Sequence, residues 1–382
     1  YHLLEDLNLL LLEELKMLDM AKYGFKFLNI ETLGNCNMNC KFCNWDSRQN
    51  KESVMCEEAV YRLIDEATHE SSGCQSINFC QFNEPLLDKR LFEFIAYTKE
   101  RGMTVFLTSN GLLLGKKRIL EGMLASGPDN LTLSVQTLSE NKFGHARGIN
   151  MDFPRYTATI YKFLSAIKDT DMQVTMDMAC NFLTPAKKIT RQILGFNVGD
   201  PNAPLTLNEV YPDLENFLKG LQVYDASFVF DSSGLKEYFE ELNSDYREQS
   251  SFSIASNIEI KIKRFMYGQR LQEFEPTMGK FECHHPILGV LASGHVVPCC
   301  HMSSPYATLG STLNKSLEDV LESGSKMIDN IRSVDGAKPL VCKRCFGERT
   351  KRAVKLVELR KKFDFDIGFH PLHHTKRGKN SS

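Results

Sequence analysis

The chain alternates short apolar runs with longer amphipathic stretches from about residue 25 onward. Runs rich in β-branched and aromatic residues predict strands, and apolar positions that recur every three to four residues predict helices. Strands are expected at 25–31, 76–80, 103–108, 130–136, 172–179 and 226–231. Helices are expected at 57–70, 88–101, 115–125, 155–168 and 212–221. Because strands that alternate with helices form parallel sheets with right-handed crossovers, these units predict a partial barrel or an open sheet.

Polar or unusual segments follow the predicted strands directly. They include the cysteine-rich loop after residue 31, QFNEP after residue 80 and SNG after residue 108. SVQT lies within and after the fourth strand, and CN ends the fifth. Ligands bind at the carboxyl ends of parallel strands, so we expect these segments to lie together around one binding site at that end of the sheet.

The rest of the chain divides by composition. Residues 1–24 are leucine-rich but interrupted by acids, which predicts an amphipathic helix and no membrane span. The barrel is expected at 25–235, followed by a connecting segment at 236–280 that holds a further plausible strand, NIEIKIK. A cysteine-rich module is expected at 281–350, and a C-terminal helix and tail at 351–382.

Composition and charge narrow the class of protein. The chain has 42% hydrophobic residues, 25% charged residues and a net charge of −2, so nucleic acid is not an expected partner. Twelve cysteines in a long chain without a signal peptide fit a reducing compartment better than a disulfide scaffold. We therefore expect a cytoplasmic protein whose thiols are available for metals.

The segment GNCNMNCKFCNW places Cys36, Cys40 and Cys43 in a C-x3-C-x2-C pattern on a turn-rich loop. Thiolates favour soft metals, so zinc and iron–sulfur clusters are the candidates. A structural zinc site needs a fourth ligand, and the next cysteine, Cys56, lies beyond a run of charged residues. Three thiolates on a cubane cluster instead leave one iron able to chelate a small molecule.

This loop resembles that of the radical S-adenosylmethionine (SAM) superfamily, whose motif is C-x3-C-x-aromatic-C, with Phe42 as the aromatic. The resemblance implies a 4Fe-4S cluster with three cysteine ligands whose open iron binds the methionine end of SAM. It also implies a 5'-deoxyadenosyl radical formed by reductive cleavage, with a flavodoxin- or ferredoxin-type protein as electron donor.

Further segments resemble the SAM-binding elements of that family. QFNEP resembles the G-G-E-P element, with Phe82 and Asn83 in place of the glycines, and Glu84 is the predicted ligand of the SAM ammonium. The alternative interpretation is that Glu84 has only a structural role, as an acid near the start of a helix. The resemblance implies that Ser109 and Asn110 face the methionine part of SAM and that Ser134 and Gln136 bind the ribose hydroxyls. It also implies that Arg147 pairs with the SAM carboxylate. An arginine suits a carboxylate because its two parallel N–H groups match the two oxygens.

A second cysteine group begins at Cys283. A hairpin around Gly294 is expected to bring Cys283 close to Cys299. Cys300 is the alternative ligand to Cys299. The segment CKRC follows after a helix near 317–330. A zinc ribbon is the alternative to an iron–sulfur site here. The pattern resembles the twitch and SPASM modules of radical SAM enzymes, which implies one auxiliary 4Fe-4S cluster held by four ligands, Cys283, Cys299, Cys342 and Cys345.

The combined expectation for the fold is an α/β chain. It is a partial (β/α)6 TIM-like barrel with a small C-terminal α+β iron–sulfur module of twitch or SPASM type. Cys56, Cys74 and Cys80 are expected in the core, whereas Cys180 ends the fifth strand and is a candidate donor of a hydrogen atom to a substrate radical.

The resemblance implies a radical SAM oxidoreductase. The substrate radical would be oxidised through the auxiliary cluster, or would take back a hydrogen atom in an epimerisation or rearrangement. Peptide-modifying relatives often carry a leader-binding domain ahead of the barrel, and only about 24 residues precede the first strand here, which favours a small sugar or aminocyclitol over a ribosomal peptide. A non-catalytic iron–sulfur carrier or sensor is the hypothesis from another class.

Overall fold

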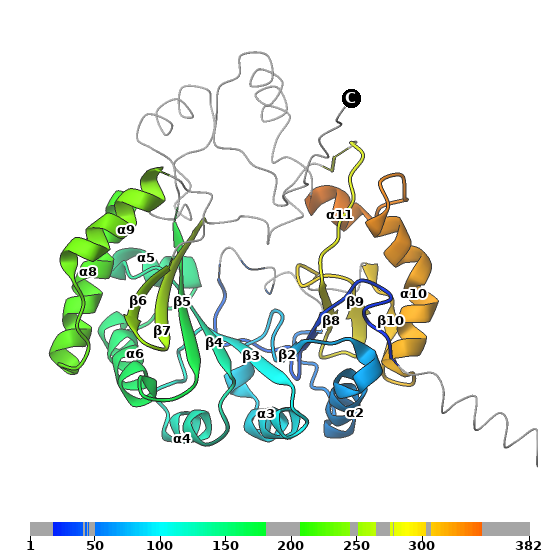
Figure 1. Cartoon of the computed structure of the whole chain (residues 1–382), viewed down its shortest axis with the longest axis horizontal. Coiled ribbons are helices and arrows are strands. Elements are labelled where there is room, and N and C mark those ends of the chain that lie inside the picture. Colours follow the sequence, from blue (N-terminus) through cyan, green and yellow to red (C-terminus); the bar gives the residue numbers. More distant parts are fainter. Residues whose placement is uncertain are drawn as a thin grey trace, which may run out of the picture.

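The computed structural model describes residues 18–40, 43, 45, 50–180, 207–244, 251–264, 276–277, 279–302 and 307–345. One sheet of ten strands organises these residues, in the order β10-β9-β8-β1-β2-β3-β4-β5-β7-β6. Its strands are β1 (Phe27–Ile30), β2 (Ser76–Asn78), β3 (Thr104–Ser109), β4 (Asn130–Gln136), β5 (Gln173–Cys180), β6 (Ser251–Ala255), β7 (Ile258–Arg264), β8 (Ile287–Val290), β9 (His295–Val297) and β10 (Gly310–Ser311). Figure 1 shows the sheet curving from β6 and β7 through β3 to the β8–β10 edge.

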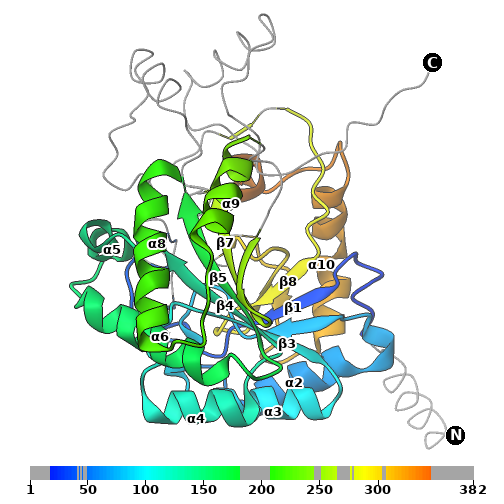
Figure 2. The ribbon, with the colours of Figure 1, turned by 60° about the vertical axis from the view of Figure 1, so that its left-hand side comes forward.

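Helices pack around this sheet, most of them on its convex side (Figures 1 and 2). They are α2 (Glu57–Thr68), α3 (Leu91–Glu100), α4 (Lys117–Ser126), α5 (Glu140–Arg147), α6 (Phe153–Ile167), α8 (Leu207–Tyr224), α9 (Ser232–Ser244), α10 (Leu317–Arg332) and α11 (Leu340–Cys345). Short 3-10 turns lie at Glu70–Ser72 and Pro85–Leu87. The α/β class and the parallel strands expected from the sequence are confirmed, because β1 to β5 pair in parallel in chain order.

The sixth parallel strand is not the one first expected. Residues 228–231 have no regular structure and lie between α8 and α9, so the predicted strand at 226–231 is wrong. Its alternation is genuine, with Phe228 buried and Val229 exposed, but Phe228 packs into the core from a loop. The strand NIEIKIK, observed as β7, pairs in parallel with β5 instead, and β6 pairs antiparallel with β7. The sheet thus extends into the segment that was expected to be a connection.

The C-terminal residues continue the same sheet. Strand β8 pairs in parallel with β1, from Phe27 opposite Ile287 to Ile30 opposite Val290. The hairpin expected around Gly294 is confirmed, because β8 and β9 are antiparallel and Gly294 has a φ of 77°. Glycine suits this turn because it adopts positive φ without steric cost. The first cysteine loop, which follows β1, and the hairpin that leads to Cys299 therefore extend from adjacent strands.

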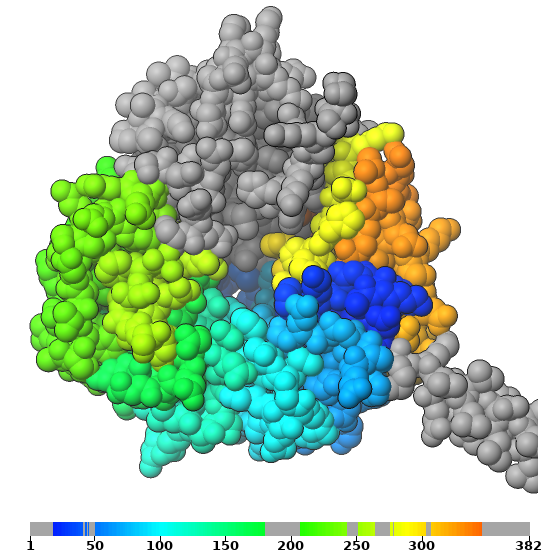
Figure 3. Space-filling view, in the orientation of Figure 1, coloured from blue at the N-terminus to red at the C-terminus, as the bar shows by residue number. Residues whose placement is uncertain are grey.

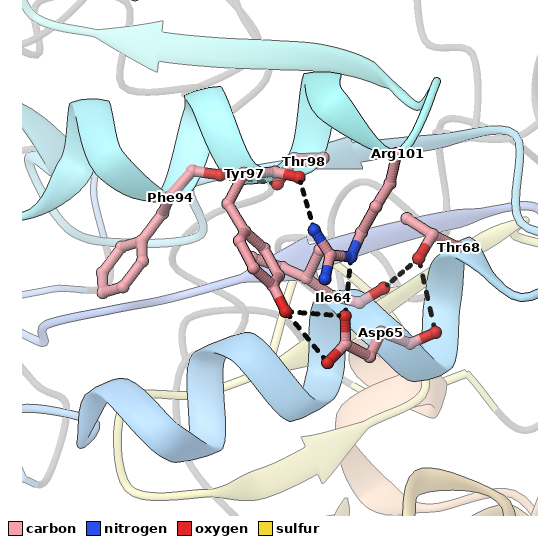
Figure 4. A network of polar contacts seen from close by, with 7 residues as sticks. All are labelled: Ile64, Asp65, Thr68, Phe94, Tyr97, Thr98 and Arg101. Atoms are coloured by element: carbon pink, nitrogen blue, oxygen red, sulfur yellow. Dashed lines mark hydrogen bonds and ion pairs between the residues drawn. The ribbon is translucent and has the colours of Figure 1, made fainter.

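Helices α2 and α3 are joined on their outer surface by a polar network (Figure 4). The Arg101 Nε and Asp65 Oδ1 atoms lie 2.7 Å apart, and the Tyr97 hydroxyl donates to Asp65 Oδ1 at 2.9 Å. The guanidinium of Arg101 also stacks over the Tyr97 ring, 3.3 Å from its centroid. These contacts fix the two helices against each other on the face of the sheet opposite to the concave side.

Residues 18–24 form a turn against α10, where Figure 3 shows the dark blue segment beside the orange one. Glu318 accepts a hydrogen bond from the Asp19 backbone N–H at 3.0 Å and another from the Tyr23 hydroxyl at 3.3 Å. The helix expected at 1–24 falls largely on residues 1–17, and the expected C-terminal helix on 351–382, both outside the described residues. Among the described helices, none has the length and apolar character needed to cross a membrane.

Candidate active site

The first cysteine loop leaves the end of β1 and is held from several sides. The backbone N–H of Glu84 donates to the Asn35 carbonyl at 3.0 Å, and Trp45 Nε1 donates to the Gly34 carbonyl at 2.9 Å. A Cβ on Gly34 would lie 2.8 Å from the carbonyl oxygens of Asn50 and Lys51, so the loop closes on itself through a position that only glycine fills. Phe42 lies outside the described residues.

The thiols of this loop suit a metal centre. Cys36, Cys40 and Cys43 are half-buried, and burial raises the pKa of Cys36 to about 12. A thiol in such surroundings ionises readily only when a cation stabilises the thiolate, as a bound metal does. Three cysteine thiols on one loop form a soft donor set, which fits a cluster with three cysteine ligands.

Glu84 is the buried acid at the centre of the site, with 1% of its surface exposed. Its Oε1 accepts from the Ser109 hydroxyl at 2.8 Å and from the Leu86 backbone N–H at 3.2 Å, and its Oε2 accepts from the Asn110 backbone N–H at 2.8 Å. Burial raises its pKa above the usual range. The structure thus brings together the predicted residues Glu84, Ser109 and Asn110.

The departure from the G-G-E-P pattern has a simple structural basis. Within the described chain, neither Phe82 nor Asn83 has positive φ, so this turn does not need glycine. The Asn83 side chain instead accepts from the Gln81 backbone N–H at 3.0 Å, and the Phe82 N–H donates to the buried carboxylate of Glu31 at 3.1 Å. Hydrogen bonds to these side-chain acceptors stabilise the turn in a conformation that does not require glycine.

Arg147 reaches the cysteine loop from the end of α5. Arg147 is 2% exposed, and its Nη1 lies 3.5 Å from the Cys40 sulfur while Nη2 donates to the Ser134 carbonyl. The Asn39 backbone N–H in turn donates to the Arg147 carbonyl at 3.1 Å. Gly148 ends α5 with a φ of 64°, and a Cβ there would lie 1.9 Å from the Asn39 carbonyl oxygen. Glycine at 148 lets the helix end pack directly on the loop.

The two predicted ribose residues lie at an irregularity in β4. The register against β5 shifts between Ser134 and Gln136, and Gln136 has a φ of 66°. Positive φ is uncommon for a residue with a side chain and often marks a functional position. Gln136 Nε2 donates to the Ser134 hydroxyl at 2.8 Å, so both polar groups stand together at the end of β4.

The second cysteine group lines one pocket. Its walls include the four predicted ligands Cys283, Cys299, Cys342 and Cys345. Burial raises the pKa of Cys342 and of Cys345 to about 12, and each is raised further by the nearby sulfurs of Cys299 and Cys283. Four thiols that line one pocket form a soft donor set, which fits a metal centre with four cysteine ligands.

Cys299 and Cys300 have different surroundings. Cys299 lines the pocket, and a hydrogen bond with Cys300 together with burial raises its pKa well above the usual value. Cys300 lies 3.6 Å from His285 Nε2, and potential ligand atoms of His285, Cys299 and Cys300 all lie within 4.8 Å of one another. This arrangement favours Cys299 as the pocket ligand, as the glycine spacing predicts.

The side chain of Gln81, which has no recognisable motif in the sequence, links β1 to the second cysteine group. Gln81 Nε2 donates to the Cys299 carbonyl at 3.2 Å and to the Met302 carbonyl at 2.9 Å, and its Oε1 accepts from Asn29 at 3.3 Å. Glu31 Oε2 also accepts from the Ala292 N–H at 3.0 Å. Polar residues at the ends of β1 and β2 are the only sequence signal of this bridge, and the identity of the partners depends on the β1–β8 pairing.

The remaining cysteines differ from one another. Cys180 is the last residue of β5, opposite Arg264 in the register, and its side chain is outside what the structure describes. Cys74 and Cys80 are half-buried. The expectation of a core position is wrong for Cys56, which is exposed because it precedes α2 at the helix N-cap.

Comparisons with known proteins identify both regions. Residues 30–180 match the radical SAM superfamily, and residues 283–346 match the SPASM iron–sulfur cluster-binding domain. A probable GTP 3',8-cyclase of Sulfurisphaera tokodaii is 24% identical over 199 residues, which are 51% of this chain and 59% of the relative. An S-adenosyl-L-methionine-dependent 2-deoxy-scyllo-inosamine dehydrogenase of Niallia circulans is 27% identical over 122 residues, which are 31% of this chain and 48% of the relative.

Among solved structures, Streptococcus suis SuiB bound to its precursor peptide SuiA aligns with a TM-score of 0.49 and 15% identity, covering 79% of this chain and 66% of that one. The chain spans 59% or less of the length of the two curated relatives above. The two matched domains imply SAM, a 4Fe-4S cluster and auxiliary iron–sulfur binding, in agreement with the cysteine sets. Residues 30–180 therefore form a radical SAM domain and residues 283–346 an SPASM-type iron–sulfur domain.

Proposed function

We propose that this chain is a radical SAM oxidoreductase that acts on a small polar molecule of the sugar or aminocyclitol type. The observation that carries the proposal is the buried Glu84 carboxylate, which lies between the cysteine loop and the end of β3. Bound SAM and its cluster would supply hydrogen-atom abstraction from a substrate carbon. The positioning of the bound molecules and the exclusion of water belong to the protein.

The protein groups suit the polar end of SAM. Glu84 accepts three hydrogen bonds, and a carboxylate offers about four acceptor positions, so one remains for the SAM ammonium. Arg147 beside Cys40 is proposed to pair with the SAM carboxylate. Ser134 and Gln136 are proposed to bind the ribose hydroxyls at the end of β4.

Net oxidation is favoured by the connection between the two cysteine sites. Gln81 contacts the carbonyl of the auxiliary ligand Cys299 and is three positions from Glu84, so one short segment contributes to both sites. The 2-deoxy-scyllo-inosamine dehydrogenase relative supports an aminocyclitol or sugar substrate. Modification of a ribosomal peptide is the alternative.

Anaerobic reconstitution with iron and sulfide, followed by an iron count and a test for 5'-deoxyadenosine on reduction, tests the proposal. We expect about eight irons per chain, as two cubane clusters require, together with the nucleoside. Cys40→Ala should abolish nucleoside formation, whereas the double variant Cys342→Ala, Cys345→Ala should retain only about four irons. Eight irons without any nucleoside would instead indicate a non-catalytic iron–sulfur carrier or sensor.

The product then separates oxidation from epimerisation. An oxidised product without solvent deuterium is expected if the auxiliary cluster takes the electron. A product that incorporates one solvent deuterium would point to return of a hydrogen atom, for which Cys180 is the proposed donor. Cys180→Ala should abolish that incorporation. A short precursor-peptide gene beside the coding gene would favour the peptide alternative.

A further inference from the structure

We propose that Asp177 and Lys263 form a subsite on the concave face of the sheet that binds an amino-alcohol group of the substrate. Both residues lie near the carboxyl ends of their strands, β5 and β7, and their side chains form an ion pair between Lys263 Nζ and Asp177 Oδ2. The inference rests on the proposed function and assigns the substrate class for that site.

Strand register places Asp177 on the concave face. Ser134 of β4, Asp177 of β5 and Lys261 of β7 are direct neighbours across the sheet. The alternate residues of the same strands, such as Leu133 and Met176, are fully buried in the core under the helices. Because side chains alternate between the two faces of a strand, the row of Ser134, Asp177 and Lys261 faces away from the helices.

This concave face is polar over several strands. Thr108, Thr132, Thr175 and Glu259 form a second row of neighbours beside the first. The interior of a closed (β/α)8 barrel is filled by bulky branched side chains, whereas here hydroxyl and charged groups face inward. Such a surface favours a ligand rich in hydroxyl and amine groups.

Asp177 stands out within this face because it is buried and incompletely bonded. Its exposed fraction is 8%, and among the described residues its Oδ1 has no hydrogen-bond partner. A buried acceptor without a hydrogen-bond partner destabilises the fold, so its presence calls for a reason. Burial also raises its pKa, despite the nearby Lys263, which is the environment of a carboxylate that needs a further donor.

The neighbouring charges define the ligand. Asp177 Oδ1 can accept from an ammonium or hydroxyl group, while the Lys263 side chain, 44% exposed, can donate to an oxygen on the adjacent carbon. Glu259 lies on the next strand but already accepts from the Thr175 hydroxyl at 2.9 Å. One free acceptor beside the accessible ammonium of Lys263 matches an amine and a hydroxyl on neighbouring carbons, as in amino sugars and aminocyclitols. Lys261, the neighbour of Asp177 in the same row, adds a second cation that can donate to a hydroxyl oxygen.

The test uses reconstituted holoenzyme with SAM bound and measures probe affinity by anaerobic calorimetry. The probes are 2-deoxy-scyllo-inosamine and glucosamine, each compared with a neutral counterpart, scyllo-inositol and glucose. We expect at least one amine to bind roughly tenfold more tightly than its counterpart, a difference of about 1.4 kcal/mol. Asp177→Asn, which keeps the size of the side chain, should remove this preference, and Lys263→Gln should weaken binding of the same amine.

The matched control is Glu259→Gln, which changes an acid of the same face and should keep the amine preference. The subsite is overturned if the wild-type protein shows no amine preference, or if Asp177→Asn retains it. Iron content and reductive formation of 5'-deoxyadenosine are measured on the same samples. If the nucleoside forms while the amine preference is absent, the subsite fails alone, and if no nucleoside forms, the proposed function fails.

Discussion

At the scale of single residues, Glu84 is the buried acid to which we assign the SAM ammonium. Its carboxylate is buried, and its position is set by the Ser109 hydroxyl and two backbone N–H groups. Burying an acid is unfavourable unless hydrogen bonds compensate it, and this acid receives three. The side chain is thus held at a fixed position before any ligand binds.

Glu84→Gln should weaken SAM binding at least roughly tenfold, because a hydrogen bond to a charged group contributes about 1.5–3 kcal/mol. Equilibrium binding of SAM to the reconstituted protein measures the effect. Glu93→Gln, at an exposed position on α3, is the control and should bind SAM like the wild type. Equal SAM affinity of Glu84→Gln and wild type would contradict the assignment of Glu84 to the SAM ammonium.

Site residues that belong to a sequence motif could be predicted from the sequence. Site residues whose partners depend on the pairing of distant strands could not. Ser109 and Asn110 follow a predicted strand in the segment TSNG, and the structure brings both to Glu84. Gln81 and Asp177 carry no spacing signal. Their partners are the Cys299 carbonyl, just after β9, and Lys263 of β7, and the positions of both strands in the sheet depend on tertiary pairing.

At the scale of elements, the end of α5 positions the cysteine loop through Gly148. Gly148→Ala should lower the iron content of the first cluster, because a Cβ would collide with the Asn39 carbonyl. Gly102→Ala is the matched control, since Gly102 has a similar φ of 74° and nothing within 4 Å of a built Cβ. Both variants carry the roughly 1–2 kcal/mol penalty of a left-handed residue, and only Gly148→Ala should lose iron. Equal iron in the two variants would refute this role.

The junction between α6 and the segment after α8 depends on one carboxylate. Asp225 accepts from Lys168 Nζ at 2.8 Å and from the Ser165 hydroxyl at 2.6 Å, and the hydrogen bond from Lys168 holds its pKa below the usual range. A carboxylate with a lowered folded-state pKa stabilises the fold above its unfolded pKa, about 3.9, and this contribution is lost as pH falls toward the folded value.

Asp225→Asn should therefore lower the urea midpoint of the cluster-free protein at pH 7, and the difference from wild type should shrink as the pH falls below about 4. The cluster-free protein is used so that loss of iron in acid does not contribute. Asp169→Asn, an exposed acid beyond the end of α6, is the control and should leave the midpoint unchanged. A difference that stays constant with pH would exclude the Asp225 contact as its source.

Helices and strands could be predicted where the apolar periodicity of the sequence agrees with the order in which the strands pair. The first five strands and four helices between them, α2, α3, α4 and α6, match the expected positions closely, because each strand has a neighbour in chain order. Helix α5 was not expected from the sequence. Residues 226–231 show why pattern alone is insufficient. Their alternation of apolar and polar positions fits a strand, yet the sheet position beside β5 is occupied by β7.

At the scale of the whole molecule, the radical SAM and SPASM-type regions share one sheet and a polar bridge. Gln81→Ala removes two hydrogen bonds to the Cys299 segment, a loss of about 1–3 kcal/mol in all. We expect a chelator to remove auxiliary-cluster iron faster, with reductive cleavage of SAM retained. Gln75→Ala, at an exposed position, should release iron at the wild-type rate. Unchanged release from Gln81→Ala would mean that the bridge does not support the auxiliary site.

The pairing of β1 with β8 also has a consequence for biosynthesis. Strand β1 leaves the ribosome early, whereas its second neighbour, which begins at Ile287, is made near the end of the chain. Contacts between such distant segments form late, so one hydrogen-bonding edge of β1 stays unpaired during most of translation. Unpaired apolar edges promote aggregation, and the nascent protein would need protection there. The adjoining cysteine loop would meanwhile remain accessible to the machinery that delivers iron and sulfide.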